Sequence, residues 1–228
     1  ALKCRSAYGK LIAAAREAVC SKGLFIAKKR YAMKIYDLEG ETVDKIKAMG
    51  LDLKRSDTPA YIQDFLSDIL DKVLTGSEEE EVMDFIADFR LEFKKMPGWE
   101  KGSPRRVNKL TEYHSREKRK GKINMPGHVR AAINWNTLKK VYNDKYSMDI
   151  IDGQKCIVCK LRDNPMGYTS IAYPTDELRI PDWFKELPFA DDQMEATLIN
   201  KKLDNLIGVL DWDLGASDAD NTFDKLFG

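Results

Sequence analysis

The sequence predicts an α+β protein in which short β-strands come first, a mainly helical region with a small β element follows, and a terminal helix and tail come last. Three observations support this class: a run rich in Phe, Ile, Tyr and Ala at residues 24–36, apolar residues at helical spacing over residues 59–95, and strand-like runs at residues 155–161 and 168–173. The 228 residues are 43% hydrophobic and 10% aromatic, which is typical of a folded protein.

The first part of the chain contains the N-terminal strands. Residues 11–19 have a helix-forming composition, whereas residues 24–36 are predicted to form two short strands or one bent strand that includes the cluster 28–31. A turn signal at residues 37–40 predicts that the flanking segments form a hairpin. Residues 51–53 alternate in polarity and predict a short edge strand.

A helical hairpin is predicted next. Thr58 and Pro59 start the first helix, because Thr accepts a hydrogen bond from the first turn and Pro loses none at the first helical position. Gly76 ends this helix, and Ser77 begins a capping box for a second helix that ends near residue 97. A connection this short predicts an antiparallel pair.

The remaining elements follow in a simple order. The basic stretch 98–128 shows little pattern. After it we predict a helix at 129–142, a hairpin turn at 152–153, strands at 155–161 and 168–173, a short helix at 181–187 and a longer helix at 192–210.

The near-zero net charge of +1 hides a strong segregation of charge. Residues 1–56 carry 13 Lys or Arg against 6 Asp or Glu, and residues 101–145 carry 13 against 3. The intervening residues 57–92 carry 2 against 11, and residues 203–228 carry 1 against 6. Basic blocks separated by an acidic block indicate a polyanionic partner; solvated charged faces are the alternative explanation.

Signatures of catalysis are scarce in the sequence. His114 and His128 lack zinc-type spacing, and strand alternation places Cys156 and Cys159 on opposite faces, which argues against a shared metal. The acidic pair at 211 and 213 lies next to an acidic tail, so we expect it to be solvated. No membrane-spanning run and no signal peptide are apparent.

The positive signal is cations with neighbouring aromatic residues, which favours binding to a nucleic-acid backbone. The candidate residues share a cationic or hydrogen-bonding side chain and fall in four clusters: Lys28, Lys29, Arg30 and Tyr31; Lys54, Arg55, Ser56 and Thr58; His128 and Arg130; Lys139 and Lys140.

Several motifs in order then give the sequence a specific resemblance. These are AKKRYA at 27–32, YDLEG at 36–40, KAMGL at 47–51, RSDTP at 55–59, MPGHVR at 125–130, IDGQK at 151–155, LRDNPMG at 161–167 and IAYP at 171–174. Together they resemble the end of the palm and the thumb of family-B DNA polymerases, in particular the replicative polymerases of T-even-type bacteriophages. The resemblance runs from about Arg16 to the last residue.

The resemblance implies roles for these positions. Residues 28–31 match the KKxY segment that tracks the primer-template duplex, with Lys29 expected near the minor-groove edge at the primer end. Residues 54–58 match the palm-to-thumb junction that holds the primer strand. His128 and Arg130 match a DNA-facing thumb segment. Phe223, Leu226 and Phe227 resemble a C-terminal peptide that docks on the sliding clamp.

The resemblance also implies what this sequence lacks. The two metal-binding aspartate motifs, DxxSLYPS and DTDS, do not occur, so the Mg²⁺ ions are expected on a catalytic palm outside this chain. The implied partners are an N-terminal polypeptide carrying exonuclease, fingers and catalytic palm, the primer-template DNA and the sliding clamp. Both a naturally split enzyme and a fragment fit this pattern, and a stand-alone DNA-binding accessory protein is the alternative function.

The resemblance also implies a division of the chain into three parts and a location. Residues 1–57 are expected to form the palm edge and a docking segment, residues 58–210 the thumb, and residues 211–228 a flexible acidic tether with the clamp-binding peptide. The implied location is the cytoplasm of an infected bacterial host.

Overall fold

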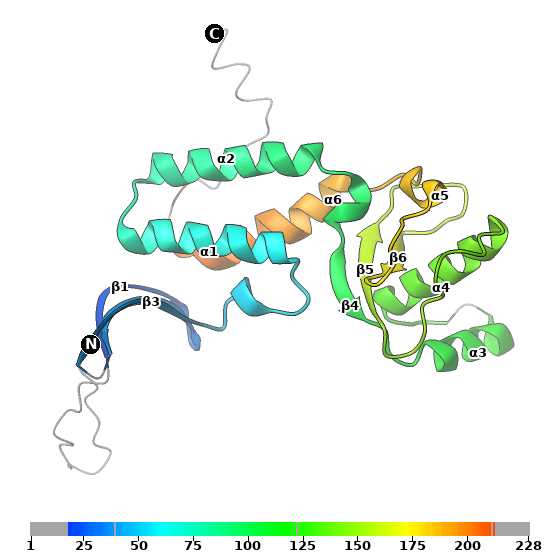
Figure 1. The fold of residues 1–228 in the computed structure, drawn as a ribbon, viewed down its shortest axis with the longest axis horizontal. Coiled ribbons are helices and arrows are strands. Elements are labelled where there is room, and N and C mark those ends of the chain that lie inside the picture. Colours follow the sequence, from blue (N-terminus) through cyan, green and yellow to red (C-terminus); the bar gives the residue numbers. More distant parts are fainter. Residues whose placement is uncertain (1–17, 39, 122, 211, 213–228) are drawn as a thin grey trace, which may run out of the picture. The chain divides into compact units, whose positions relative to one another are not determined.

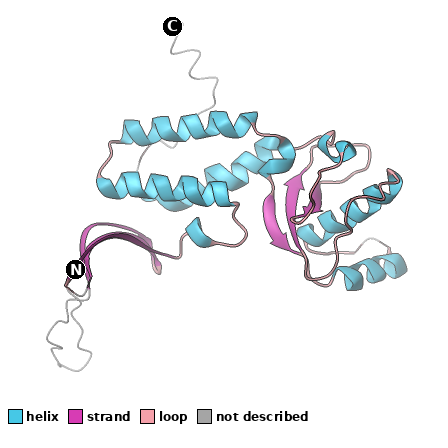
Figure 2. Cartoon of the chain, viewed as in Figure 1, coloured by secondary structure: helices cyan, strands magenta, loops and turns pink. Residues whose placement is uncertain are grey.

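The computed structural model describes residues 18–38, 40–121, 123–210 and 212, and it confirms the α+β class (Figures 1 and 2). The chain divides into two compact units. The first unit comprises residues 1–54, 61–89 and 202–228, and the second comprises residues 55–60 and 90–201. The predicted acidic pair at 211 and 213 and the clamp-binding residues Phe223, Leu226 and Phe227 lie outside the described residues.

The first unit contains a three-stranded antiparallel sheet in the order β1 (Ala18–Ala27), β2 (Arg30–Leu38) and β3 (Glu41–Met49). The β2–β3 pairing confirms the predicted hairpin. Ala27 pairs with Arg30, so Lys28 and Lys29 form a two-residue turn. This finding corrects the prediction that they lie within an extended run, because Lys29 has the positive φ of 65° that tight hairpin turns use.

Two local predictions at the ends of this sheet were wrong. Ala18 and Val19 belong to β1, so the helix-forming composition of this stretch yields a strand there, while residues 11–17 lie outside the described part of the chain. Residues 51–53 were predicted to be an edge strand, but Asp52–Lys54 is a 3-10 helix (η1). The positive φ of 69° at Gly50 turns the chain out of β3 before this segment can pair.

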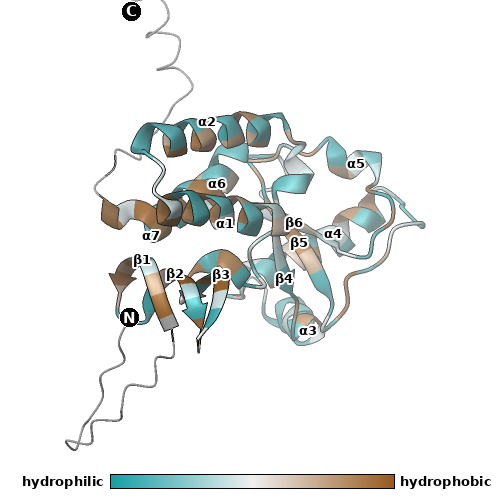
Figure 3. Cartoon of the chain, turned by 60° about the vertical axis from the view of Figure 1, so that its left-hand side comes forward, coloured by the Kyte–Doolittle hydropathy of each residue, from teal (hydrophilic) through white to brown (hydrophobic). Residues whose placement is uncertain are grey.

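The predicted helical hairpin is confirmed by α1 (Ala60–Thr75) and α2 (Glu79–Lys95). The ring of Phe65, near the start of α1, stacks on Phe89, near the end of α2, with centroids 3.7 Å apart. At the other end, Lys72 Nζ lies 2.6 Å from Glu81 Oε1. These two contacts establish the antiparallel pairing, and apolar residues recur along both helices in Figure 3.

The core of the first unit lies around α1. Its buried face consists of Ile62, Phe65, Leu66, Ile69, Leu70 and Leu74. The sheet is tied to this helix by Lys34, whose Nζ lies 3.6 Å from Asp71 and 3.3 Å from Asp44. The helix α7 (Lys201–Ile207) is tied to η1 by Lys202, whose Nζ lies 3.5 Å from the Asp52 carboxylate.

The second unit contains the antiparallel sheet β4 (Ser103–Arg106), β5 (Lys155–Lys160) and β6 (Ser170–Pro174). The predicted strands β5 and β6 are confirmed, and so is the helix α4 (Gly127–Val141). The helix is fixed to β6 because Asn134 Nδ2 donates to the Ser170 carbonyl at 2.8 Å. Trp135 of α4 is fully buried and donates its indole N–H to the Met148 carbonyl.

The basic stretch 98–128 contains more structure than its pattern indicates. It forms the 3-10 helix η2 (Gly98–Lys101), β4 and the helix α3 (Leu110–Lys120). The Asp152 carboxylate accepts hydrogen bonds from the N–H groups of Leu110 and Thr111, which are the first residues of α3. The turn at 152–153 therefore supports α3, and it does not join consecutive strands as predicted, because β4 pairs with β5 across α3 and α4.

The C-terminal elements follow the prediction with one irregularity. A short helix, α5 (Asp182–Lys185), confirms the predicted helix near residue 181. The longer helix is α6 (Asp191–Glu195), a π-helical turn (Ala196–Asn200), α7 and a final 3-10 turn (Gly208–Leu210). In the second unit, Arg90 donates to the Asn200 side chain at 2.8 Å beside this π turn.

Candidate nucleic-acid interface

The tip of the β1–β2 hairpin presents the first predicted cation cluster. Lys28 and Lys29 are exposed, and both belong to the two-residue turn. Gly50 lies against this turn, because a Cβ at Gly50 would collide with the Lys29 carbonyl oxygen. The close packing of Gly50 against the Lys29 carbonyl therefore fixes the position of the turn that carries Lys28 and Lys29.

One face of the same sheet combines aromatic, apolar and cationic side chains. Phe25 pairs with Tyr31, and Tyr31 pairs with Met49, so the three side chains share one face. The Phe25 and Tyr31 rings stack with centroids 6.2 Å apart, and Phe25 is 68% exposed. Aromatic side chains beside cations are the components of single-strand and backbone binding sites.

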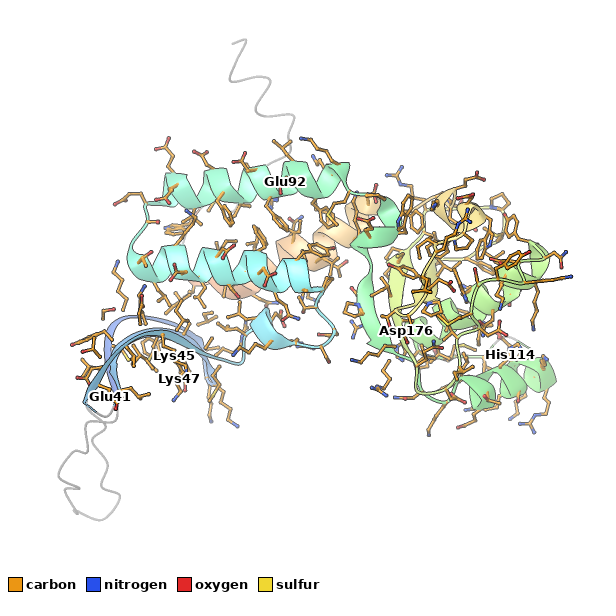
Figure 4. All side chains as sticks on the ribbon, viewed as in Figure 1. Glu41, Lys45, Lys47, Glu92, His114 and Asp176 are labelled. Atoms are coloured by element: carbon orange, nitrogen blue, oxygen red, sulfur yellow. The ribbon has the colours of Figure 1, made fainter. Side chains whose placement is uncertain are left out.

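Lys45 and Lys47 of β3 extend this face (Figure 4). Lys45 lies four positions and Lys47 two positions before Met49 in the strand. Both are exposed, and alternation places them on the Met49 side. Phe25, Lys45 and Lys47 were not predicted as site residues from the sequence. The signal that indicates the two lysines is the Lys-Ile-Lys alternation at residues 45–47, which is a half-buried strand pattern.

The other predicted cations of the first unit differ in whether their charge is exposed to solvent or engaged within the protein. Arg30 is half-buried, and its guanidinium donates to the Asn205 carbonyl of α7. Lys54, at the end of η1, is exposed. Arg30 therefore helps to hold α7, whereas Lys28, Lys29 and Lys54 offer their charge to solvent.

In the second unit a carboxylate brings two arginines together. The Asp57 carboxylate lies 3.0 Å from Arg55 and 3.0 Å from Arg105 of β4. Ser56 is exposed in the turn between Arg55 and Asp57, while Thr58 is buried and donates its backbone N–H to the Arg55 carbonyl at 3.0 Å. Asp57 thus fixes both guanidinium groups and leaves the cluster with a net positive charge.

His128, at the start of α4, joins this cluster. It is half-buried, and burial together with the nearby positive charge of Arg105 lowers the pKa of its imidazole. A lowered pKa keeps His128 neutral at physiological pH, so it offers a hydrogen bond and no charge. Arg105, which was not predicted from the sequence, therefore contacts Arg55 through Asp57 and acts electrostatically on His128, although Arg55 and His128 are far apart in the sequence.

The predicted cations on α4 separate into paired and exposed residues. Arg130 is held by an ion pair with Glu117 of α3 and donates to the Ile123 carbonyl at 3.0 Å. Lys139 is bound to Asp149 at 2.8 Å. Lys140 is exposed and lines a cavity of about 270 Å³ with His114. Of these three cations, Lys140 is the one placed to reach a ligand in solution.

The described residues contain no group of three or more His, Cys, Asp or Glu side chains placed to hold a metal ion. Cys156 and Cys159 are both buried, in agreement with a sheet that is covered on both faces. Burial raises the pKa of the Cys156 thiol to about 12 and also raises that of Cys159, so both thiols stay protonated. In the described ranges, no helix is long and apolar enough to cross a membrane.

Comparison with known proteins gives this surface a context. The sequence model of the family described as "DNA polymerase family B" matches residues 5–130, more than half of the chain. This match begins before Arg16, where the resemblance was expected to start. The DNA-directed DNA polymerase of Enterobacteria phage T4 is 28% identical over 156 residues, and that of Escherichia phage RB69 is 30% identical over 156 residues. Each alignment covers 67% of this chain and 17% of the relative, so the chain matches a small part of each polymerase.

Proposed function

The chain belongs to family B of the DNA polymerases, and from this premise we propose that it is the thumb-bearing portion of a DNA-directed DNA polymerase. Its role is to grip the primer-template duplex during phage DNA replication. The observation that carries the proposal is the exposed turn of Lys28 and Lys29 beside the aromatic and cationic sheet face. The implied location is the cytoplasm of the infected bacterium.

The grip is directed at the DNA backbone. Lys28, Lys29 and Lys54 of the first unit and Lys140 of the second unit are exposed cations, and each can neutralise a phosphate. The cluster of Arg55, Asp57 and Arg105 adds one net positive charge in the second unit. Contacts with phosphates fix the position of a duplex without reading its sequence, which is what a polymerase requires of the product it has just made. Tyr31 and Phe25 supply a surface against sugars or an unpaired base.

This chain contributes positioning to the reaction. Holding the primer end in place converts the meeting of the 3′-hydroxyl and the nucleotide into an effectively unimolecular step. We assign the Mg²⁺ ions to a catalytic palm on another polypeptide, which also carries the exonuclease and the fingers, since the two aspartate motifs that the family resemblance leads us to expect do not occur in this sequence. This chain and that polypeptide together form the enzyme.

The tail completes the proposal. Phe223, Leu226 and Phe227 follow an acidic stretch at 211–221, and we assign them to a hydrophobic pocket on the sliding clamp. Tethering the polymerase to a ring around DNA raises its effective concentration at the primer end and so increases the length of each synthesis run.

Primer extension tests this function. The chain is titrated into the polypeptide that carries the catalytic palm, on a primed template, and the extension rate is measured. We expect extension to rise well above that of the catalytic polypeptide alone. Extension that stays at the level of the catalytic polypeptide, together with retained DNA binding by this chain, would refute the subunit role and support a stand-alone DNA-binding accessory protein.

A further inference from the structure

The second unit contains an apolar groove that the grip on DNA does not use. It has a volume of about 580 Å³ and is lined by two loops, residues 144–148 after α4 and residues 176–181 between β6 and α5, together with Asp182 and Trp183 at the start of α5. Trp183 forms part of its wall and stacks on Tyr142, with centroids 5.2 Å apart and an interplanar angle of 9°. Both loops adjoin α4, β6 and α5 in Figure 1.

Two large apolar side chains stand at the groove without any protein cover. Leu178 is 100% exposed and Tyr146 is 98% exposed, and they come from opposite loops. Met148 adds a third partly exposed apolar side chain to the lining. Exposed apolar side chains grouped around a groove mark an interaction site, whereas single ones scattered over a surface do not.

The first loop is held in a single shape by its own hydrogen bonds. The Asp144 carboxylate accepts from the N–H groups of Tyr146 and Ser147, from the Ser147 hydroxyl at 2.7 Å and from the Trp183 indole at 2.9 Å. These bonds connect the loop that carries Tyr146 to the wall of the groove. Tyr146 is thus presented on an ordered loop, which reduces the conformational entropy that this loop would lose on binding a partner.

The second loop is fixed to the first in the same way. The Glu177 carboxylate accepts from the N–H of Met148 at 2.8 Å, so the residue that precedes Leu178 is joined to the first loop. The Met148 carbonyl in turn accepts from the buried Trp135. Both rims of the groove are therefore built before any partner arrives.

The charge around the groove selects the partner. Four carboxylates line it (Asp144, Asp176, Glu177 and Asp182) against one lining cation, Arg179. Asp182 is paired with Lys185 at 3.0 Å, and the remaining three carboxylates still outnumber Arg179. Asp176 is exposed and is labelled in Figure 4. Phosphates are repelled by such a rim, which sets the groove apart from the cation clusters of the candidate DNA surface. A positively charged partner is attracted to it.

A small molecule seated in the groove would leave the fully exposed rim uncovered, whereas a polypeptide segment covers both groove and rim. We propose that this groove docks a segment of another protein that carries one or two bulky apolar residues between lysines or arginines. The apolar residues enter between Leu178 and Tyr146 against Trp183, and the flanking cations meet Asp176 and its neighbours. This docking is separate from the grip on DNA and does not depend on it.

Two synthetic peptides provide the probe. Both are fifteen residues long and carry Trp, Leu and Phe at the same central positions; in one the flanks are Lys and Arg, in the other Asp and Glu. Binding to the full chain is followed by the NMR signal of the Trp183 indole N–H, assigned with Trp183→Phe. We expect the cationic peptide to shift this signal in a saturable manner and to bind at least tenfold more tightly than the acidic peptide.

Substitutions in the chain locate the binding. We expect Leu178→Ser and Tyr146→Ser each to lower the affinity of the chain for the cationic peptide about tenfold or more. The matched control is Val141→Ser, because Val141 is 70% exposed in the same unit and does not line the groove. We expect this control to leave the affinity within twofold of the unsubstituted chain.

Three results would overturn the proposal. One is equal affinity for the two peptides, and another is an affinity that Leu178→Ser and Tyr146→Ser do not change. The third is a Trp183 shift produced by a primer-template duplex or by raising the concentration of the chain alone, since these would assign the groove to DNA or to a second copy of the chain.

Discussion

The charge at the β1–β2 turn makes a quantitative prediction about DNA binding. Replacing Lys28 and Lys29 together by Gln removes two charges, keeps the side-chain length and leaves the Ala27–Arg30 pairing in place. Each phosphate contact on duplex DNA contributes a slope of about 0.9 to the fall of log K with log salt. We therefore expect the double variant to lower that slope by about 1.8.

The two lost charge contacts also determine how much DNA affinity the double variant loses. Two exposed charge contacts in water are worth about 1 kcal/mol each, which corresponds to a loss of roughly 30-fold at low salt. Binding to a fluorescein-labelled primer-template is measured by anisotropy between about 50 and 200 mM salt, a range over which counterion release is large. We expect the curves of the variant and the parent chain to converge as the salt concentration rises.

A second lysine pair provides the control. Lys94 and Lys95, at the end of α2, are exposed and have the same charge. We expect Lys94→Gln with Lys95→Gln to leave the salt slope unchanged. An equal loss of slope in both double variants would show that only net charge matters, and an unchanged slope in the turn variant would refute the role of Lys28 and Lys29.

Four further predictions follow from the structure. Gly50→Ala should weaken DNA binding and lower stability by about 1–3 kcal/mol, because a Cβ collides with the turn at Lys29; a variant that melts and binds as the parent does would contradict this. Burial alone would raise the pKa of Asp144, but hydrogen bonds from Ser147, Trp183 and the loop backbone lower it from 3.8 to about 2. Because the pKa of Asp144 is lower in the folded state than in the unfolded state, the ionised carboxylate stabilises the fold by about 1–2 kcal/mol after allowance for solvent screening. This stabilisation is present above about pH 4 and is lost as the pH falls towards 2. Asp144→Asn should abolish that part of the pH dependence of the free energy of unfolding, measured in urea. Arg130→Met should destabilise the chain by about 1–3 kcal/mol, whereas Lys140→Gln should weaken DNA binding and leave the melting temperature unchanged. A stable Arg130→Met chain together with an unstable Lys140→Gln chain would contradict both assignments. Removing residues 223–228 should preserve synthesis by the assembled enzyme and abolish its stimulation by the clamp; surviving stimulation would refute the tail assignment.

Local patterns predicted the regular elements well. Apolar spacing identified α1 and α2, and turn signals identified the β2–β3 hairpin, because in each case the signal lies within one short segment. The helix α3 was not predicted, because its start is supported by Asp152, a residue distant in sequence that no local pattern connects to Leu110. The turn at Lys28 and Lys29 was not predicted, because lysine is not a typical residue for a positive φ.

The candidate site was predictable in type and less so in detail. The cation clusters were visible in the sequence, but which side chains remain available depends on partners elsewhere in the fold. Arg30 is engaged by Asn205, and Arg130 by Glu117, whereas Arg105 comes to Arg55 through Asp57. The division into parts at residues 57 and 210 and the clamp-binding role of the tail stay predictions.

The central claim is that the turn of the β1–β2 hairpin lies on the primer-template, and photo-crosslinking tests it most directly. A benzophenone amino acid is introduced in place of Lys29 or, as a control, of Glu92, an exposed residue of α2 labelled in Figure 4. The assembled polymerase is then irradiated on a primer-template of known sequence. The account predicts a crosslink from position 29 to the duplex close to the primer end and none from position 92. Absence of the crosslink from position 29, or equal crosslinking from both positions, would contradict it.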